Sequence, residues 1–328
     1  MSQKTPHTSD SPNYGGDNRG SYSGGFISGR PEAKAFTFTT PANQMVPVLI
    51  AAPHGGRDYP ENLRSAMREP DYCALRLEDR YVDALAGEIA RQTDASLLVA
   101  HAPRAMLDLN RATDDVDWGM ISGKPPGVPR NSQSNRRARS GLGLVPRRLP
   151  GFGEIWKTPI DTAELDARIE GIHRPYHKAL GKELARLRDQ WGAALLVDLH
   201  SMPPLKRQFG QDRAPGFVLG DRFGASCDSS LIAHAFRHFE AAGEMAAHNR
   251  PYAGGFVLDH HSLPARGIHA VQVEVCRSAY LDHRMEQPSA KMPAVAQLLA
   301  GLVRQLSSVT AQLSPHLGLG GDFAQAAE

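Results

Sequence analysis

Two histidines, each at the end of an apolar stretch and followed by small residues, are well suited to chemistry. His54 stands in Pro-His-Gly-Gly after residues 46–52, and His200 stands in Asp-Leu-His-Ser directly after residues 193–199. An imidazole in such a position leaves a ring nitrogen open to a cavity. Two histidines and one carboxylate form the usual three-ligand site of a catalytic zinc ion, with a fourth position left for water. One histidine alone would favour a structural role; the pair favours a metal site.

Several carboxylates are candidates for the third ligand. Asp79 leads, because it belongs to the same strand–loop–helix unit as His54 and stands where an amphipathic pattern begins. That position suits a helix N-cap equally well. Glu78, Glu61 and Asp58 are the alternatives.

Glu274 lies within the apolar stretch 270–275 and is the candidate general base. In a strand, Gln272 and Glu274 would point to one face and the intervening valines to the other. A carboxylate among β-branched residues is costly to bury without a partner. The functional interpretation is that Glu274 takes a proton from the attacking water and passes it to the leaving amine.

Four cationic or amide side chains and one tyrosine are candidates for substrate contacts. Arg111 and Asn110 follow a short apolar stretch, and a guanidinium fork beside an amide suits a carboxylate. Arg104 would polarise a carbonyl oxygen or pair with an acid. Arg277 is a further candidate for a substrate carboxylate, and Tyr252 would face the substrate or serve as scaffold.

Strands and helices that alternate along the chain would position these residues. Apolar stretches predict strands, and 3.6-residue periodicity predicts helices. The predicted strands cover 46–52, 96–100, 105–109, 193–199, 216–220 and 270–275, and the predicted helices begin at 79 or cover 161–190, 228–241 and 292–306. Asp161 is the predicted N-cap of the second helix, with Glu164 at the capping-box position. The alternation predicts an α/β fold, a mixed sheet covered by helices on both faces.

The chain is predicted to form one domain over residues 36–328. Residues 1–35 are rich in Ser, Gly, Asn and Asp and are expected to be disordered. Residues 114–155 are rich in Gly, Pro and Arg. A loop of that length in a compact domain is typical of a segment that covers an active site.

Charge and cysteine usage exclude several classes of function. The chain has 37 Lys and Arg against 35 Asp and Glu. Its net charge of +2 is too small to create an electrostatic field that would attract nucleic acid or an anionic membrane. The arginines within 136–148 are interpreted as a solvated loop. Three widely spaced cysteines, no signal-peptide pattern and no apolar stretch of about 18 residues favour a cytoplasmic protein.

The sequence resembles the N-formylglutamate amidohydrolase family in eight stretches that occur in order. These are PHGG at 53–56, LEDRYVDAL at 77–85, LDLNR at 107–111, GLGLVP at 141–146, HRPYH at 173–177, VDLHSMP at 197–203, RPYAGG at 250–255 and VQVEVCRSAYLD at 271–282. A motif such as DLHS alone would be weak evidence, whereas the ordered set is specific. The resemblance implies a phosphorylase/hydrolase-like fold, similar to zinc carboxypeptidases and aspartoacylase.

The resemblance also implies an activity and a cofactor. Members of the family hydrolyse N-formyl-L-glutamate to formate and glutamate, the last step of one route of histidine degradation. His54 and His200 would be metal ligands with Asp79 as the third, the ion being divalent and expected to be Zn²⁺. The Asn-Arg pair would hold a substrate carboxylate and Glu274 would be the general base. One departure is Gly55, where the family usually has Ser.

Three other functions are compatible with the same residues. The chain could be an amidase for another N-acyl amino acid or for a cell-wall peptide. It could also be a catalytically inactive binding protein for acidic metabolites. A nucleic-acid-binding protein that uses the Arg-rich loop would show strongly salt-dependent binding. The expected partner is therefore a small N-acyl amino acid, with no nucleic acid and no membrane; the oligomeric state is not predicted.

Overall fold

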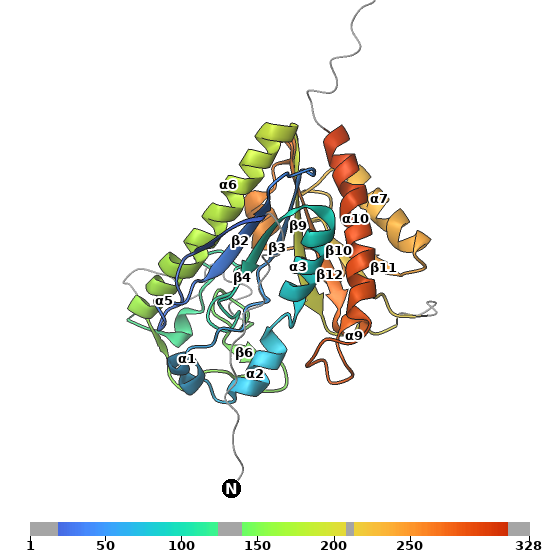
Figure 1. The fold of residues 1–328 in the computed structure, drawn as a ribbon. Helices are drawn as coiled ribbons and strands as arrows, with labels where there is room; N and C mark the ends of the chain where they lie inside the picture. Colours follow the sequence, from blue (N-terminus) through green and yellow to red (C-terminus); the bar gives the residue numbers. More distant parts are fainter. Residues whose placement is uncertain (1–18, 124–139, 208–212, 314–328) are drawn as a thin grey trace, which may run out of the picture.

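An eight-stranded mixed sheet forms the centre of the computed structural model, which describes residues 19–123, 140–207 and 213–313 (Figure 1). In spatial order its strands are β1 (Arg19–Gly24), β2 (Phe36–Pro41), β4 (Ser96–Ala100), β3 (Val48–Ala52), β9 (Ala194–Met202), β12 (Ile268–Cys276), β10 (Phe217–Gly220) and β11 (Ala246–His248). The four central strands β4, β3, β9 and β12 are parallel to one another, whereas β2 and β10 pair with them in antiparallel fashion. The predicted mixed α/β sheet is confirmed.

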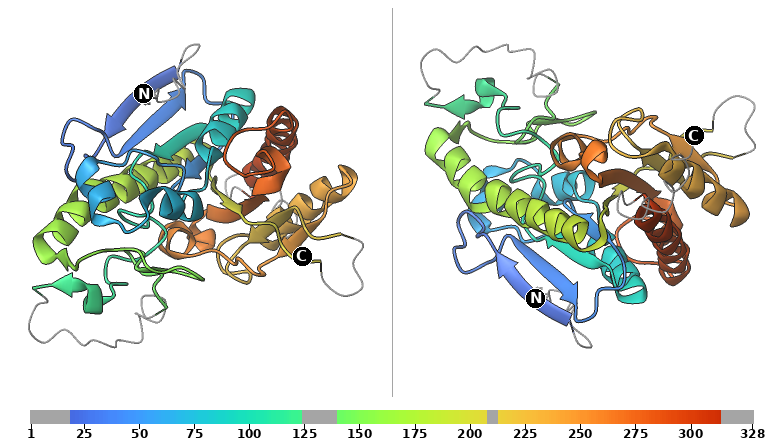
Figure 2. Two further views of the ribbon diagram at one scale, coloured as in Figure 1. Left: turned by 90° about the horizontal axis from the view of Figure 1, so that it is seen from below. Right: turned by 90° about the horizontal axis from the view of Figure 1, so that it is seen from above.

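Helices cover both faces of this sheet (Figures 1 and 2). One face packs against a long helical segment made of α5 (Thr162–Arg168), the π-helical turn η3 (Ile169–His173) and α6 (Arg174–Trp191), together with α8 (Phe256–His261). The other face packs against α3 (Val82–Thr93), α7 (Ser229–Ala241) and α10 (Met292–Gln312). Shorter elements lie around the sheet: α1 (Glu61–Ala66), α2 (Pro70–Leu77), η1 (Trp118–Met120), η4 (Pro264–Arg266), α9 (Arg277–Tyr280) and the strand pairs β5 (Ile121–Ser122) with β8 (Ile160–Asp161) and β6 (Arg148–Leu149) with β7 (Gly153–Glu154).

Alternation along β9 and β12 separates two apolar cores and prepares a polar site. Leu195, Val197 and Leu199 of β9 and Val271, Val273 and Val275 of β12 pack in the core under α3 and α10, as the sequence predicts for the valines of β12. Even-numbered residues point toward α6. They are apolar at the start of each strand and polar at its end, in the order Ala194, Leu196, Asp198, His200 and Ile268, Ala270, Gln272, Glu274. The carboxyl ends of the central strands therefore carry buried polar groups on the α6 face.

The strand predicted at 105–109 is wrong. These residues form turns, with the backbone N–H of Met106 donating to Pro103 O at 2.9 Å. Met106 and Leu107 are nevertheless buried in the core under α6. The apolar side chains correctly predicted that this segment is buried, but a buried segment can be either a strand or a turn that packs beneath other elements.

Residues 19–35, expected to be disordered, belong to the fold, so the folded part begins before Phe36. Strand β1 pairs along its whole length with β2 at the edge of the sheet. Farther along, the N–H of Phe26 donates to Gly171 O at 2.9 Å. These backbone bonds supply contacts that a composition rich in Gly and Ser does not reveal. Residues 1–18 lie outside the described residues.

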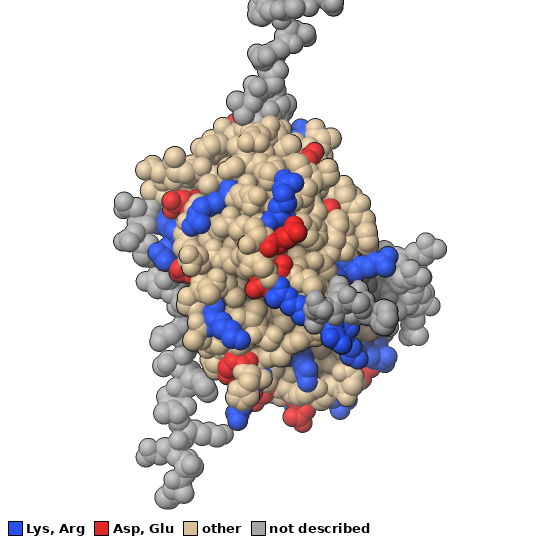
Figure 3. Space-filling view, turned by 90° about the vertical axis from the view of Figure 1, so that its right-hand side faces the viewer, with Lys and Arg blue, Asp and Glu red and all other residues tan. Residues whose placement is uncertain are grey.

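The predicted insertion at 114–155 contains short elements rather than one irregular loop. η1, β5, β6 and β7 lie within it, and residues 124–139, with three of its clustered arginines, lie outside the described residues. Arg147 pairs with Asp117 at 2.9 Å and with Glu154 at 2.8 Å. On the face shown in Figure 3, basic and acidic side chains are interspersed among other residues. No described helix is both long enough and apolar enough to cross a membrane.

The helix predicted at 161–190 forms with one interruption. Asp161 caps its first turn, as predicted, by accepting from Ala163 N at 2.7 Å. Glu164 makes no capping box, because its carboxylate binds Arg168 and Ser28 instead. The interruption is the π-helical turn η3, which the sequence pattern did not predict.

Two buried histidines pair behind the sheet. The rings of His177 in α6 and His261 in α8 stack with centroids 5.2 Å apart, and Nδ1 of the first lies 2.9 Å from Nε2 of the second. Burial, and then the charge of His260, lower the pKa of His261 to about 3. Burial also holds the pKa of His177 well below its usual value. Both rings are therefore neutral at neutral pH.

This pair predicts a loss of stability in mild acid. Below pH 6.5 an unfolded chain protonates His261 while the folded chain does not, so stability rises with pH between about 3 and about 6.5. His261 alone should cost about 2 kcal/mol of unfolding free energy between pH 6.5 and pH 5. Urea unfolding of metal-free protein at several pH values measures this slope. His261→Gln should flatten it, and equal slopes in variant and wild type would refute the prediction.

Candidate active site

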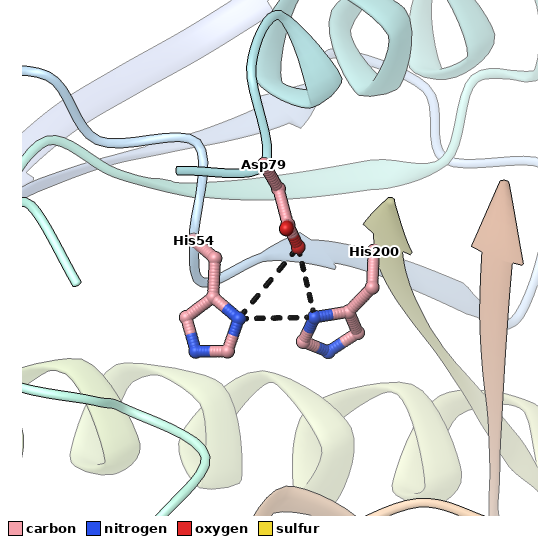
Figure 4. A group of neighbouring side chains, drawn as sticks. All are labelled: His54, Asp79 and His200. Atoms are coloured by element: carbon pink, nitrogen blue, oxygen red, sulfur yellow. Dashed lines mark hydrogen bonds and ion pairs between the residues drawn. The ribbon is translucent and has the colours of Figure 1, made fainter. Parts of the chain in front are cut away.

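Three of the predicted ligands meet at the carboxyl ends of β3 and β9. His54 Nδ1, His200 Nδ1 and Asp79 Oδ2 face one another, as Figure 4 shows. The two nitrogens are 3.1 Å apart, and the oxygen lies 3.2 Å from His200 and 3.7 Å from His54. All three side chains are buried, with exposed fractions of 3% or less. The sequence placed the two histidines in one site, and the structure adds Asp79 to it.

Two further aspartates orient the histidine rings. His54 Nε2 lies 2.7 Å from Asp108 Oδ1, and His200 Nε2 lies 2.9 Å from Asp198 Oδ2. A carboxylate only accepts, so each histidine donates from Nε2 and leaves Nδ1 as the ring atom that a metal ion would bind. Carboxylates that hold metal-ligating histidines in this way are typical of zinc sites. The sequence reasoning had given neither aspartate this role.

The geometry fits a divalent metal ion. Ligand atoms placed about 2.0–2.1 Å from a tetrahedral zinc ion lie roughly 3.3 Å from one another, close to the three distances observed here. Two imidazole nitrogens and one carboxylate oxygen converge here, and a divalent cation would displace any proton on the two Nδ1 atoms and bind all three groups. Burial opposes the charged forms, yet Asp198 and Asp79 raise the pKa of His200 well above its usual value. The site is thus strongly attractive to positive charge.

Local backbone contacts explain why these ligands meet. The N–H of Asp79 donates to His54 O at 3.0 Å and ties the two loops together. A Cβ at Gly56 would lie 2.2 Å from Ala102 O, so only glycine fits there. A Cβ at Gly55 would lie 2.8 Å from Asp83 Cβ, which shows that this departure from the family pattern is packed against α3. The loop after β3 is therefore fixed by close backbone approach.

The structure shows that Asp79 does not cap helix α3. Helix α3 begins at Val82, its N-cap is Tyr81, and no side chain makes a capping bond there. Of the alternatives, Glu78 and Asp58 are ion-paired with arginines, and Glu61 starts α1 on the surface. Asp79 alone of the four belongs to the group that could hold a metal ion.

Glu274 lies beside this group. In the parallel pairing of β12 with β9 it stands opposite His200, and Gln272 stands opposite Asp198. Gln272 Nε2 donates to Glu274 Oε1 at 2.9 Å. Within the described residues nothing donates to Oε2. Burial, opposed by His200 and reinforced by Asp79, raises the pKa of Glu274 to about 7. One carboxylate oxygen is therefore held in place and the other is free to accept a proton.

Arg104 approaches the same space from the other side. Its Nε donates to Asp108 Oδ2 at 2.9 Å, so one aspartate holds both His54 and Arg104. The rest of its guanidinium has no partner within the part of the chain that the structure describes, and 26% of its side chain is exposed. Although burial lowers it, the charges of Asp108, Asp79 and Glu274 raise the pKa of Arg104. A cation with unused N–H groups thus faces the site.

Asn110 contacts Gln272, the neighbour of Glu274, and also lines an adjoining cavity. Its Oδ1 accepts from Val257 N at 3.0 Å, and its Nδ2 lies 3.4 Å from Gln272 Oε1. A Cβ at Gly255 would lie 2.6 Å from Asn110 Oδ1, so a glycine is needed for this approach. With Oδ1 occupied, the amide offers its second N–H to a ligand.

The other three predicted contact residues lie at different distances from the centre. Arg111 Nε donates to Leu142 O at 2.9 Å, and Arg111 lines a cavity of about 240 Å³ with Asn110. Tyr252 packs against Met202 and Cys276, the last residues of β9 and β12. Burial, and then the charges of Glu274 and Asp79, raise the pKa of Tyr252.

Arg277 is bonded to one of the predicted ligands, Asp79. Its guanidinium binds Asp79 Oδ1 at 3.3 Å, Ser201 Oγ at 3.1 Å and two backbone carbonyls of the α2 region. These contacts suit a residue that fixes the orientation of Asp79. The predicted contact with a substrate carboxylate is not visible in them.

Comparisons with known proteins indicate one family. A model of the N-formylglutamate amidohydrolase family matches residues 46–281. N-formylglutamate deformylases of Pseudomonas aeruginosa and Pseudomonas putida are 30% and 32% identical, each over 80% of this chain and 91% of its own length. The crystal structure of an N-formylglutamate amidohydrolase from Ralstonia eutropha is 28% identical, with a TM-score of 0.75 over 85% of this chain and 99% of that one. A gene product of Agrobacterium tumefaciens, at 19% identity and a TM-score of 0.62 over 87% of this chain and 98% of that one, shares the fold.

Proposed function

This chain belongs to the N-formylglutamate amidohydrolase family, and from that membership we propose that it hydrolyses N-formyl-L-glutamate to formate and glutamate. One observation carries the chemistry: a buried His-Asp-His group lies next to a carboxylate whose second oxygen is free. The curated relatives are named for this substrate, and the match covers most of their length.

The metal in this proposal is Zn²⁺, held by His54, Asp79 and His200. Two imidazole nitrogens and one carboxylate oxygen are the donor set typical of catalytic zinc. A divalent ion there would polarise the amide carbonyl and lower the pKa of a nearby water. Asp108 and Asp198 fix the two rings, and Arg277 fixes the carboxylate of Asp79.

Glu274 is proposed as the general base and then the general acid. Its Oε2 would take a proton from the water that attacks the formyl carbon, and would deliver it to the nitrogen of glutamate as the C–N bond breaks. A pKa of about 7 lets one carboxyl group do both at neutral pH. Gln272 supports this role by holding Oε1.

The basic and amide groups are proposed to bind and polarise the substrate. Arg104, with unused N–H groups, would stabilise the negative charge that develops on the formyl oxygen. Asn110 and Arg111 would hold a carboxylate of the glutamate, since both line the cavity beside the centre. Tyr252 would close the site from the loop before Gly254 and Gly255.

We further propose a cytoplasmic enzyme of histidine degradation, as the family resemblance implies. The three cysteines are free and buried in the structure, which is compatible with a reducing compartment.

Formate release from a panel of N-acyl amino acids tests the proposed substrate. N-formyl-L-glutamate should give the highest kcat/KM, and the glutamine analogue should be at least about tenfold poorer, because a neutral amide cannot form the charge-assisted fork that a carboxylate forms with the Arg111 guanidinium. Formyl and acetyl derivatives of Glu, Gln, Asp and Ala form the panel, with formate or acetate as the measured product. Preference for an uncharged side chain or for a cell-wall peptide would contradict the proposal.

A further inference from the structure

The motif His-Arg-Pro-Tyr-His at 173–177 has no part in the chemistry above, yet its histidines reach the loop that presents Asn110 and Arg111. We propose that His173 and His177 are positioning residues for substrate binding. They hold the backbone of the loop so that the amide and the guanidinium face the substrate carboxylate. The inference rests on the proposed function for its kinetic consequence, but not for its structural one.

The helix is shaped so that both rings point at this loop. Pro175 has no N–H for the carbonyl of Gly171 four residues earlier, and that carbonyl accepts from Phe26 N at 2.9 Å instead. The π-helical turn η3 ends at His173, and such turns inside α-helices are frequent at functional sites. His173 and His177, four residues apart, then lie on one face with ring centroids 4.3 Å apart.

Each histidine binds one carbonyl of the loop. His173 Nε2 donates to Arg111 O at 2.9 Å, and His177 Nε2 donates to Leu109 O at 3.0 Å. The two carbonyls stand on either side of Asn110. Because a carbonyl only accepts, both rings carry their proton on Nε2. His177 Nδ1 is then an acceptor, and His261 Nε2 donates to it at 2.9 Å.

The loop depends on such bonds because it lies outside the strands and helices. Residues 109–111 belong to no ladder that would fix their carbonyls. Side-chain bonds from Asp108 and the N–H of Val257 fix the amide groups of Asn110, whereas the histidines fix the carbonyls. Both histidines are buried, with exposed fractions of 4% and 7%, so water does not easily replace them.

Neither of these two bonds involves a metal ligand, although Asp108, which binds His54, also accepts from Asn110 N at 2.8 Å. His54 is held by Asp108, which precedes the loop, and His200 is held by Asp198 on β9. Loss of a histidine of the motif should therefore disturb substrate binding and leave the metal in place. This separation distinguishes a positioning role from a general structural one.

Kinetics of His173→Leu and His177→Leu test the proposal. Each should raise KM for N-formylglutamate about tenfold, with kcat within about threefold of wild type and an unchanged metal content. His→Gln at either position places an amide N–H near the lost Nε2–H and should restore much of KM. His260→Leu is the matched control, because that exposed ring stacks on Phe256 and makes no bond to the loop. If a leucine variant does not fold, His→Asn, whose amide is too short to reach the carbonyl, takes its place.

Hydrogen–deuterium exchange provides the readout that needs no catalysis. Amides of residues 109–112 should exchange faster in the Leu or Asn variants than in wild type, and at the wild-type rate in His260→Leu. If wild-type protein released no formate, the proposed function would fail and this exchange would still decide the inference. Unchanged exchange in the loop, an unchanged KM, or a fall in kcat accompanied by loss of metal would overturn it.

Discussion

Replacing Glu274 by glutamine is expected to lower kcat for formate release by about 10²- to 10⁴-fold, the usual contribution of general acid–base catalysis. The substitution keeps the shape of the side chain and removes the oxygen that accepts the proton. Gln272 can still contact the new amide, so the strand and the metal ligands should stay in place. KM should change little, because Glu274 is not proposed to bind a substrate carboxylate.

Three measurements make this prediction specific. Metal content should equal that of wild type, and the acid limb of the wild-type pH profile should disappear, since it reports deprotonation of the base. In wild type the base is active above its pKa and protonated below it, so activity should rise with pH through that limb. Glu183→Gln is the matched control: it also changes a buried glutamate on the α6 side, but one that binds Ser96 and Arg186. Full activity of Glu274→Gln with metal bound would remove Glu274 from the mechanism.

Replacing His200 by alanine is expected to abolish metal binding at micromolar metal and to reduce activity to background. Removal of a supporting carboxylate typically costs 10- to 100-fold in metal affinity or activity, so loss of a ligand should cost more than about 100-fold. The variant also leaves the charges of Asp79 and Asp198 buried without their shared partner. Elemental analysis and formate release measure the two effects on the same sample.

Graded variants separate ligands from their supports. Asp198→Asn keeps the ligand but weakens the orientation of its ring, so it should show a partial loss of about 10- to 100-fold. His238→Ala should retain metal and activity, because that imidazole binds Leu298 O on the opposite side of the sheet. Equal metal content in His200→Ala and wild type would contradict the assignment of the ligands.

The sequence predicted those parts of the site whose signals are local. His54, His200 and Glu274 stand in or just after apolar strands, and strand alternation put Gln272 beside Glu274. The central strands and main helices followed from the same patterns. The strand predicted at 105–109 is a turn, because apolar burial looks alike in strands and in packed turns, and several short or edge elements, such as β2, α1, α2 and β11, were not predicted.

Parts that depend on contacts distant in sequence could not be predicted. Asp79 was balanced between ligand and cap, since its meeting with His200 is a tertiary contact across 121 residues. The bond from His54 to Asp108 spans 54 residues, so the role of Asp108 became visible only in the structure. Arg277 was predicted to contact the substrate, and its bond to Asp79 could not be predicted because it is a contact across 198 residues.

The backbone of β1 and the π-helical turn also lacked a local signal. The Gly and Ser content of residues 19–25 predicted disorder, whereas in the structure residues 19–24 pair with β2 as strand β1. The direction of His173 and His177 depends on the π-helical turn that precedes them, which the sequence analysis did not predict.

Formate release by wild-type protein before and after removal of its metal tests the central claim most directly. Chelator treatment followed by buffer exchange should abolish hydrolysis of N-formyl-L-glutamate, and about one equivalent of Zn²⁺ per chain should restore it, as expected for three ligands around one ion. Elemental analysis of each sample verifies the metal content. Undiminished formate release by protein shown to contain no metal would contradict the account.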